Sequence, residues 1–424
     1  MRATARPCAL LVVGCLLALV IPFGSAGAQT PVPEDDRAAI QELLDRRAEA
    51  FLERDRAAFM ATIDPAARSF VRRQTDMWRW SKPVPFESYR YVLDWARFGD
   101  LARPSDRRKY AGAEAVAIPL TQERYQLRGF DEVAAVEDLY LTFVKRDGEW
   151  LVAGDDDLDQ VGLLSARHPW DMGPLVATRS DHFIGLGPPC ANDGAYCADQ
   201  ELLARAEDAL TRVNGTWTLP WNDEVVLVVP HSGPSLARML QATFDPADFV
   251  AFAYSTVDPV DLGYTGDRIL VNPAVIAGRP PSEVLRIMAH ELAHVATRDV
   301  SGPSVPLFID EGLAEYAGYG GSRGLAYFDA VVSAGLFDGR LPEDHEFSTG
   351  TADDIYLSYQ EAQSAVRYFI QRWGLKKFTR FYRRLGAARL TPGLATWHAD
   401  RAMKRTIGMG LRGFEKAWAS SIGA

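Results

Sequence analysis

The five residues His290-Glu291-Leu292-Ala293-His294 constrain this chain more than any other part of its sequence. On a helix, positions i and i+4 lie on one face with Cβ atoms about 5–6 Å apart, so both imidazoles can converge on one ion. Tetrahedral Zn²⁺ requires such convergence. Glu291 points to the side where water would bind, within reach of its proton. The pattern predicts a helix with two metal ligands and a general base. The alternative is a chance match on a structural helix.

A catalytic zinc site keeps three protein ligands and one open position, so a further His, Asp or Glu is expected downstream. Sixteen residues lie between His294 and Glu311, enough for a loop over 298–306 and an antiparallel second helix. Ser, Gly, Asp and Pro in this segment favour the loop. We expect Glu311 to complete the site and Gly312 to let the two helices approach closely.

Two acidic neighbours of Glu311 have different expected roles. Glu315 lies one turn further along the same face, where it can accept a hydrogen bond from the non-ligating nitrogen of a zinc-bound histidine. The alternative for Glu315 is a solvated helix carboxylate. Asp310 competes for the third ligand position, but it is rotated by about 100° from Glu311. Only one of the two can face the ion, and we favour Glu311.

These motifs resemble the gluzincin branch of the zinc metallopeptidases, and most closely the peptidase MA-like group. The resemblance rests on His-Glu-x-x-His followed by Leu-Phe-Ile-Asp-Glu-Gly-Leu-Ala-Glu-Tyr at 307–316, and it covers 177–424. It implies that His290, His294 and Glu311 bind zinc and that Glu291 is the general base.

The same resemblance implies a tyrosine whose hydroxyl steadies the oxyanion, at the start of a periodic helix near residue 356. Tyr359 is the first candidate and Tyr356 the second, and the alternative is that these aromatic residues only pack in the core. The chain lacks the Gly-x-Met-Glu-Asn segment with which the large aminopeptidases of this branch capture a substrate's amino terminus. We therefore expect an endopeptidase.

The amino terminus has the pattern of a secretory signal peptide over 1–28. A basic start precedes an apolar run over 9–23, and Ala26-Gly27-Ala28 fits cleavage after Ala28. We expect a secreted or otherwise extracytoplasmic protein with no membrane span in the mature chain. The alternatives are a lipid anchor at Cys15 and an uncleaved signal anchor.

After cleavage, only Cys190 and Cys197 remain, with six residues between them in a loop rich in Gly and Asn. An oxidising compartment favours a local disulfide, and the alternative is a zinc site built from these two residues.

Cleavage would remove two of the 46 Lys and Arg residues and none of the 56 Asp and Glu residues, so the net charge would change from −10 to −12. Such a chain is not expected to bind nucleic acid. The basic residues Arg380, Arg383 and Arg384 lie on an amphipathic helical pattern, which favours a solvated face. The expected partner is a peptide or protein substrate.

A mature chain of roughly 400 residues exceeds what one core usually holds, which predicts two domains. We place them at 34–160 and 177–424, with a linker at 161–176. The amino-terminal region predicts helices followed by strands, and its elements are expected at 35–56, a stretch through Ile63, 87–95, 113–126, 132–144 and a hairpin turning at Asp147-Gly148. It is similar to the cone-shaped NTF2-like fold in Ala48-Glu49-Ala50-Phe51 and Gly148-Glu149-Trp150-Leu151.

Two features of this region have competing interpretations. Aromatic residues at 78, 80, 89 and 91 are expected to pack in the core rather than to line a ligand pocket. The run Asp155-Asp156-Asp157 is expected to be an exposed linker rather than a calcium site, because it lacks EF-hand spacing.

The second region predicts a small twisted sheet before the His-Glu-x-x-His helix, which makes the chain α+β overall. Strands are expected at 178–184, 224–230, 249–255 and 268–272, with a helix at 200–213. We predict that 268–272 is the sheet edge to which a peptide adds as an extra strand.

The leading hypothesis is an exported zinc metallopeptidase that hydrolyses peptide bonds with a zinc-activated water and Glu291 as general base. The alternative is a zinc-stabilised, catalytically idle cell-envelope binding protein. Substrate preference and the ligand of the amino-terminal domain are not encoded in any motif.

Overall fold

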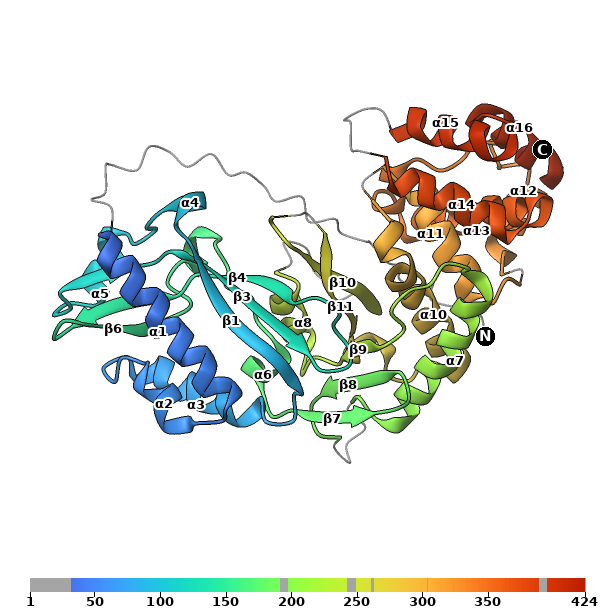
Figure 1. The fold of residues 1–424 in the computed structure, drawn as a ribbon. Helices are drawn as coiled ribbons and strands as arrows, with labels where there is room; N and C mark the ends of the chain where they lie inside the picture. Colours follow the sequence, from blue (N-terminus) through green and yellow to red (C-terminus); the bar gives the residue numbers. More distant parts are fainter. Residues whose placement is uncertain are drawn as a thin grey trace.

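The computed structural model describes residues 32–190, 197–241, 249–260, 263–302, 304–322, 324–388 and 395–423. The predicted signal peptide and Cys15 lie outside these ranges. The chain forms a mixed α+β structure in which a central sheet lies between an amino-terminal layer and a carboxyl-terminal group of helices (Figure 1).

The amino-terminal part begins with three helices that cover two small antiparallel sheets. The helices are α1 (Glu34–Leu52), α2 (Arg56–Ala61) and α3 (Arg68–Trp80), with short α4 (Trp95–Phe98) and α5 (Pro104–Lys109) following later. One sheet has the order β1 (Phe86–Asp94), β3 (Leu120–Leu127), β4 (Ala135–Leu139). The other has the order β2 (Ala115–Ala117), β5 (Thr142–Arg146), β6 (Glu149–Gly154).

Two predicted strands of this part are wrong because the chain changes sheet within them. The expected strand at 113–126 is divided between β2 and β3 around Pro119, whose missing N–H disfavours a continuous ladder. The expected strand at 132–144 is likewise divided between β4 and β5. The hairpin is confirmed, since Asp147 and Gly148 have φ of 50° and 81° and join antiparallel β5 and β6. Helix α3 was not among the elements expected from the sequence.

Two further expectations concerned polar and aromatic residues of this part. Tyr89 and Tyr91 are buried in the core, as expected, with ring centroids 5.3 Å apart. The expectation of an exposed acidic linker is wrong, because Asp155 and Asp157 are buried. Asp157 accepts a hydrogen bond from Tyr110 at 2.8 Å, and basic neighbours ion-pair with both carboxylates. A short helix, α6 (Pro169–Met172), follows.

The central sheet has the order β10 (Ala251–Val257), β11 (Tyr264–Val271), β9 (Val225–Val228), β8 (Phe183–Gly187), β7 (Val176–Arg179). β11, β9 and β8 are parallel, and both edge strands are antiparallel to their neighbours. Its side chains alternate between two cores. Val225 and Leu227 pack with the carboxyl-terminal helices, whereas Val226 and Val228 pack with the amino-terminal layer. The sheet therefore belongs to both halves of the molecule.

The structure corrects two predictions about this sheet. The expected strand at 178–184 spans the turn between β7 and β8. The expected edge at 268–272 belongs to β11, which is paired on both sides, and the edge next to the helices is β10. Strand order depends on which distant segments pair, and alternation within one strand carries no information about its neighbours.

The carboxyl-terminal half is helical. Its elements are α7 (Gln200–Thr216), α8 (Gly233–Met239), α9 (Pro273–Ile276), α10 (Pro281–Thr297), α11 (Leu307–Gly318), α12 (Ala326–Ser333), α13 (Ala352–Trp373), α14 (Leu375–Gly386), α15 (Ala395–Ile407) and α16 (Leu411–Ile422). α10 packs against α7 and α11, and α11 packs against α13 (Figure 1). None of the helices in the described ranges is long and apolar enough to cross a membrane.

Candidate metal centre

The first two candidate ligands come from a helix that is enclosed on all sides. α10 starts with Pro281 in its first turn, where the missing N–H costs no hydrogen bond. From Ile287 to Thr297 every residue is buried, because α10 packs against the sheet and against α7 and α11. A helix surrounded in this way holds its side chains in fixed positions. His290 and His294 both project toward α11, with ring centroids 5.0 Å apart.

The third candidate ligand comes from α11, which the structure places antiparallel to α10 as expected. Glu311 is 1 % exposed. Gly312 has a different role from the expected one, because a Cβ there would lie 2.6 Å from the Ala362 carbonyl oxygen on α13. Gly312 therefore allows α13, rather than α10, to approach α11. The glycine that faces α10 is Gly318, where a Cβ would lie 3.1 Å from the Arg286 carbonyl oxygen.

The structure brings the three candidate ligand atoms together in a nearly equilateral triangle. His290 Nε2 lies 3.2 Å from His294 Nε2 and 3.2 Å from Glu311 Oε2, and His294 Nε2 lies 3.5 Å from the same oxygen. Donors held at about 2.0–2.1 Å around a tetrahedral ion are about 3.3–3.4 Å apart. Within the described ranges, Glu311 Oε2 is buried with no hydrogen-bond partner. Two imidazoles and one carboxylate fit Zn²⁺ in both chemistry and spacing.

Each candidate ligand imidazole has a carboxylate at its other nitrogen. His290 Nδ1 lies 3.0 Å from Glu315 Oε1, as the sequence predicted, and His294 Nδ1 lies 3.5 Å from Asp310 Oδ2. Asp310 therefore contacts the other side of a histidine rather than competing with Glu311. Carboxylates in this position fix the tautomer of a metal-bound histidine.

Two residues that were not expected from the sequence hold these carboxylates. Arg286 Nη1 lies 3.1 Å from Glu315 Oε1, and the Tyr382 hydroxyl donates a hydrogen bond to Asp310. Arg286 lies one turn before His290 on α10, so its position was available as a weak signal. Tyr382 lies on α14, and no local pattern connects it with the site.

The two imidazoles are surrounded by the carboxylates of Glu291, Glu311, Glu315 and Asp310. Burial opposes ionisation of His290, but Glu311 and Glu315 outweigh it and raise the pKa of His290 to about 9. Burial likewise opposes ionisation of His294, and Glu311 with Asp310 raises its pKa well above the ordinary value. The carboxylates that stabilise a proton on these rings would equally stabilise a divalent cation between them.

The candidate general base lies beside the edge strand of the sheet. Glu291 is fully buried, and its Oε2 accepts a hydrogen bond of 2.8 Å from the Ala253 N–H on β10. Its Oε1 has no hydrogen-bond partner in the part of the chain described. Burial raises the pKa of Glu291 and so brings that pKa closer to pH 7, where a general base is most effective. The Ala253 carbonyl accepts a hydrogen bond of 3.3 Å from Arg298.

The two tyrosines proposed from the sequence have different surroundings. Tyr359 is 1 % exposed, and its ring centroid lies 6.3 Å from that of His290. Burial, with the nearby carboxylates of Glu311 and Glu315, raises the pKa of Tyr359 well above its ordinary value. Tyr356 is half-buried and its ring lies 5.8 Å from Tyr327. Of the two tyrosines, Tyr359 is the one whose ring lies near a candidate metal ligand.

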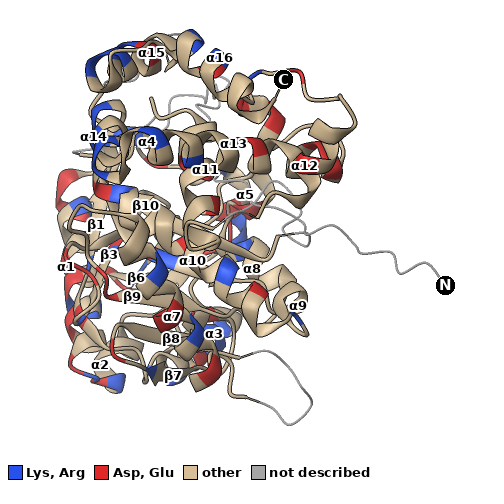
Figure 2. Ribbon diagram, turned by 90° about the vertical axis from the view of Figure 1, so that its right-hand side faces the viewer, with Lys and Arg blue, Asp and Glu red and all other residues tan. Residues whose placement is uncertain are grey.

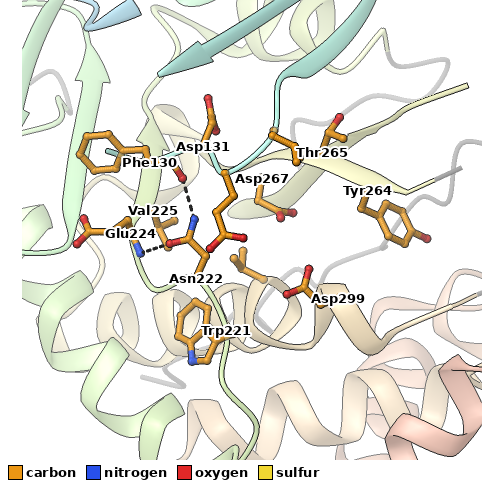
Figure 3. Close-up of a pocket in the computed structure, with 14 residues that line it drawn as sticks. Phe130, Asp131, Trp221, Asn222, Glu224, Val225, Tyr264, Thr265, Asp267 and Asp299 are labelled. Atoms are coloured by element: carbon orange, nitrogen blue, oxygen red, sulfur yellow. Dashed lines mark hydrogen bonds between the residues drawn. The ribbon is translucent and has the colours of Figure 1, made fainter. Parts of the chain in front are cut away.

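A separate cavity of about 70 Å³ lies near the end of α10 and does not include the candidate ligands (Figure 3). Several carboxylates line it, but basic residues neutralise two of them. Asp131 pairs with Arg268 at 2.6 Å, and Asp267 pairs with Arg298 at 3.0 Å. It is a polar junction between the loop at 130–133 and β11 rather than part of the metal centre.

The predicted disulfide between Cys190 and Cys197 is present, with Cα atoms 5.3 Å apart. Because both thiols are oxidised, the alternative of a zinc site built from them is not supported. Residues 191–196 of the intervening loop lie outside the description.

Residues 273–424 match the model of the Peptidase MA superfamily. This segment runs from α9 to the end of the chain and contains all the candidate metal ligands, Glu291 and Tyr359. The match supports a gluzincin-type peptidase. The amino-terminal part lies outside it, so its NTF2-like assignment stays a prediction. No curated protein matches the chain.

Among solved structures, the chain is similar to mutants of M1 zinc metallopeptidases. One, from Deinococcus radiodurans with a bound Tyr-Ser-Ala substrate, is 15 % identical with a TM-score of 0.34, over 65 % of this chain and 58 % of that one. A two-domain M1 zinc metallopeptidase bound to L-arginine is 14 % identical with a TM-score of 0.34, over 66 % of this chain and 58 % of that one. This chain thus spans less than two thirds of the length of each.

Proposed function

We propose that this protein is an exported zinc-dependent peptidase. The observation that carries the proposal is the triangle formed by His290 Nε2, His294 Nε2 and Glu311 Oε2, with Glu291 one residue after the first ligand. A purely structural zinc site is closed by a fourth protein ligand and needs no base. Here three donors converge, and a fourth position remains for substrate or water.

Zinc bound at these donors would act as a Lewis acid that polarises the scissile carbonyl and makes water more acidic. The protein's own residues do the rest. Glu291 accepts the proton of the attacking water at Oε1 and later delivers it to the leaving amine. The Ala253 N–H holds the other oxygen and so fixes the carboxylate. Glu315 and Asp310 orient the imidazoles through their Nδ1 atoms.

Tyr359 is proposed as the residue that stabilises the oxyanion. A pKa well above the ordinary value keeps its hydroxyl protonated at neutral pH, so it can donate a hydrogen bond to developing negative charge. Its buried position beside His290 supports this role.

Export and domain organisation are part of the same proposal. The sequence pattern over 1–28 supports a signal peptide cleaved after Ala28, and the Cys190–Cys197 disulfide is compatible with an oxidising compartment. An NTF2-like domain at 34–160, a linker at 161–176 and an endopeptidase domain at 177–424 are also proposed. The absence of a Gly-x-Met-Glu-Asn segment favours endopeptidase action.

The proposal is tested by metal analysis and by hydrolysis of a peptide library. Wild-type protein should contain one zinc per chain, and Glu291→Gln should keep the zinc but lose about 10²–10⁴-fold in kcat. Glu201→Gln on α7 is the matched control, since it makes the same chemical change at an exposed position whose ion pair is with Arg205. Undiminished hydrolysis by Glu291→Gln would exclude the base. Full zinc occupancy without turnover on any peptide would favour the idle binding protein.

A further inference from the structure

The carboxyl-terminal helices differ in charge from the rest of the molecule. Residues 375–424 contain eleven Lys or Arg and two Asp or Glu, a net charge of +9. The whole chain carries −10, so the preceding 374 residues carry −19. These helices lie at the end of the molecule opposite α2 and α3 (Figure 1). The protein is therefore electrically polarised from one end to the other.

The positive charge on α14 is concentrated on one face. Its basic residues have the spacing i, i+1, i+4, i+7 and i+8, which places them within an arc of about 120°. All five are exposed, and within the described ranges none forms an ion pair with an acidic residue; they are Lys376, Lys377, Arg380, Arg383 and Arg384. The opposite face, which includes Phe378, Phe381 and Leu385, is buried in the core. The helix is fixed in place, so the basic face must remain on the surface.

The neighbouring helix α15 extends this face. Arg384 Nη1 donates a hydrogen bond of 2.8 Å to the Thr406 hydroxyl, which joins the two helices. Arg401 and Arg405 are exposed one turn apart on α15. Figure 2 shows Lys and Arg residues along both α14 and α15. Trp397, one turn before Arg401, is 47 % exposed, and the Arg401 guanidinium lies 5.1 Å from its ring centroid. The surface thus combines positive charge with an exposed indole.

We propose that this basic face binds the surface of an anionic phospholipid membrane. The face consists of the five basic residues of α14 with Trp397, Arg401 and Arg405 of α15. Four to eight basic residues on one helical face are typical of binding to acidic lipid headgroups. An exposed indole suits the interface, because tryptophan prefers the boundary between apolar and aqueous phases. The helix would not insert, since its apolar face is already buried. The anionic membrane would repel the rest of the protein, which carries a charge of −19, so the protein would bind in one orientation.

The test measures co-sedimentation of the full mature protein with vesicles of phosphatidylcholine, alone or with one third phosphatidylglycerol. We expect binding only to the anionic vesicles and a decrease with rising salt. Each basic residue near such a surface contributes up to about fivefold to binding. Neutralising four should therefore lower the partition coefficient at least about tenfold, in the variant Lys376→Gln, Lys377→Gln, Arg380→Gln, Arg383→Gln. Arg384 is kept because it bonds to Thr406.

A matched control removes four exposed basic residues from α1, α2 and α3 at the opposite end, namely Arg46→Gln, Arg56→Gln, Arg68→Gln, Arg72→Gln. It should bind the vesicles at least as well as wild type. Equal melting temperatures would show that both variants are folded. Equal loss in both variants, or binding to uncharged vesicles, would overturn the proposal. So would tighter binding to a DNA duplex than to anionic vesicles at equal phosphate, or a salt-sensitive dimer that the α14 variant abolishes, since these identify a nucleic acid or a second copy as the partner.

Discussion

The molecule contains two buried clusters of histidine and carboxylate that look alike and differ in how their atoms are paired. In the amino-terminal half, His168 Nε2 lies 2.6 Å from Glu123 Oε2, and the other oxygen of Glu123 accepts a hydrogen bond from Tyr89. In the candidate metal centre, the Nε2 atoms of His290 and His294 face each other at 3.2 Å. In the first cluster, each Glu123 oxygen is paired with a group that can donate a hydrogen bond. In the second, two imidazole nitrogens and one Glu311 oxygen converge on the same point.

This is the difference expected between a structural network and a site that binds a ligand. Buried polar groups are normally satisfied by hydrogen bonds, and an unsatisfied one is costly. Glu291 Oε1 and Glu311 Oε2 have no such partner within the described ranges, whereas both oxygens of Glu123 are bonded. Carboxylate oxygens left without a hydrogen-bond donor are suited to bind a cation. The His168 cluster needs nothing further.

The largest expected effect comes from breaking the triangle. Glu311→Gln replaces the charged donor with a weaker neutral one, and we expect loss of bound zinc and of all measurable peptide hydrolysis. Metal content after dialysis measures the first effect. Glu123→Gln makes the same change in the His168 cluster and should lower stability while leaving zinc content at the wild-type value. Loss of zinc in both variants would show that the two clusters are not independent.

The next effect concerns Tyr359. Tyr359→Phe should lower kcat about 10²–10³-fold with zinc content and KM nearly unchanged, because the lost hydrogen bond would form only in the transition state. Tyr356→Phe is the control, since Tyr356 packs against Tyr327 instead. If Tyr359→Phe kept full activity, its role would be limited to packing.

The third effect is a pH dependence of stability. Burial opposes ionisation of His168, but Glu123 outweighs it and raises the pKa of His168 to about 9. The ordinary value is about 6.5, so this stabilisation is fully present below pH 6.5 and is lost as the pH rises through 9. Its size is on the order of 3 kcal/mol.

The measurement is the free energy of unfolding of wild type and His168→Gln between pH 6 and 10. The difference between them should be largest at pH 6 and should shrink toward pH 10. The contribution of Glu137 to stability also decreases as the pH rises, but at lower pH. Burial raises the pKa of Glu137 to about 7, so its protonated form is favoured in the folded state. A difference that stayed constant with pH would show that His168 is not charged in the folded protein.

The sequence predicted the parts of the molecule that depend on local order. The His290 and His294 pair, the returning helix with Glu311, and the Asp147-Gly148 turn each follow from spacing within a few residues. Three other features could not be predicted in this way, because each depends on which distant segment packs beside it. They are the edge strand, the helix that packs against Gly312 and the burial of Asp155. Tyr382 belongs to this second group, since it reaches Asp310 across 72 residues of chain.

The smallest expected effect is on zinc affinity. It compares two similar contacts between a carboxylate and a histidine, only one of which involves a candidate metal ligand. Glu315 and Glu207 both lie 3.0 Å from a histidine Nδ1, that of His290 and His182 respectively. The His182 side chain is 38 % exposed, and His182 is not one of the candidate ligands. Glu315→Gln should weaken zinc binding about 10–100-fold in competition with a chelator, because the ligand loses basicity and a fixed orientation. Glu207→Gln should leave zinc affinity unchanged. An unaltered affinity in Glu315→Gln would mean that the packing of α10 against α11 alone positions the imidazole, and that the negative potential around the ligands matters less than their geometry.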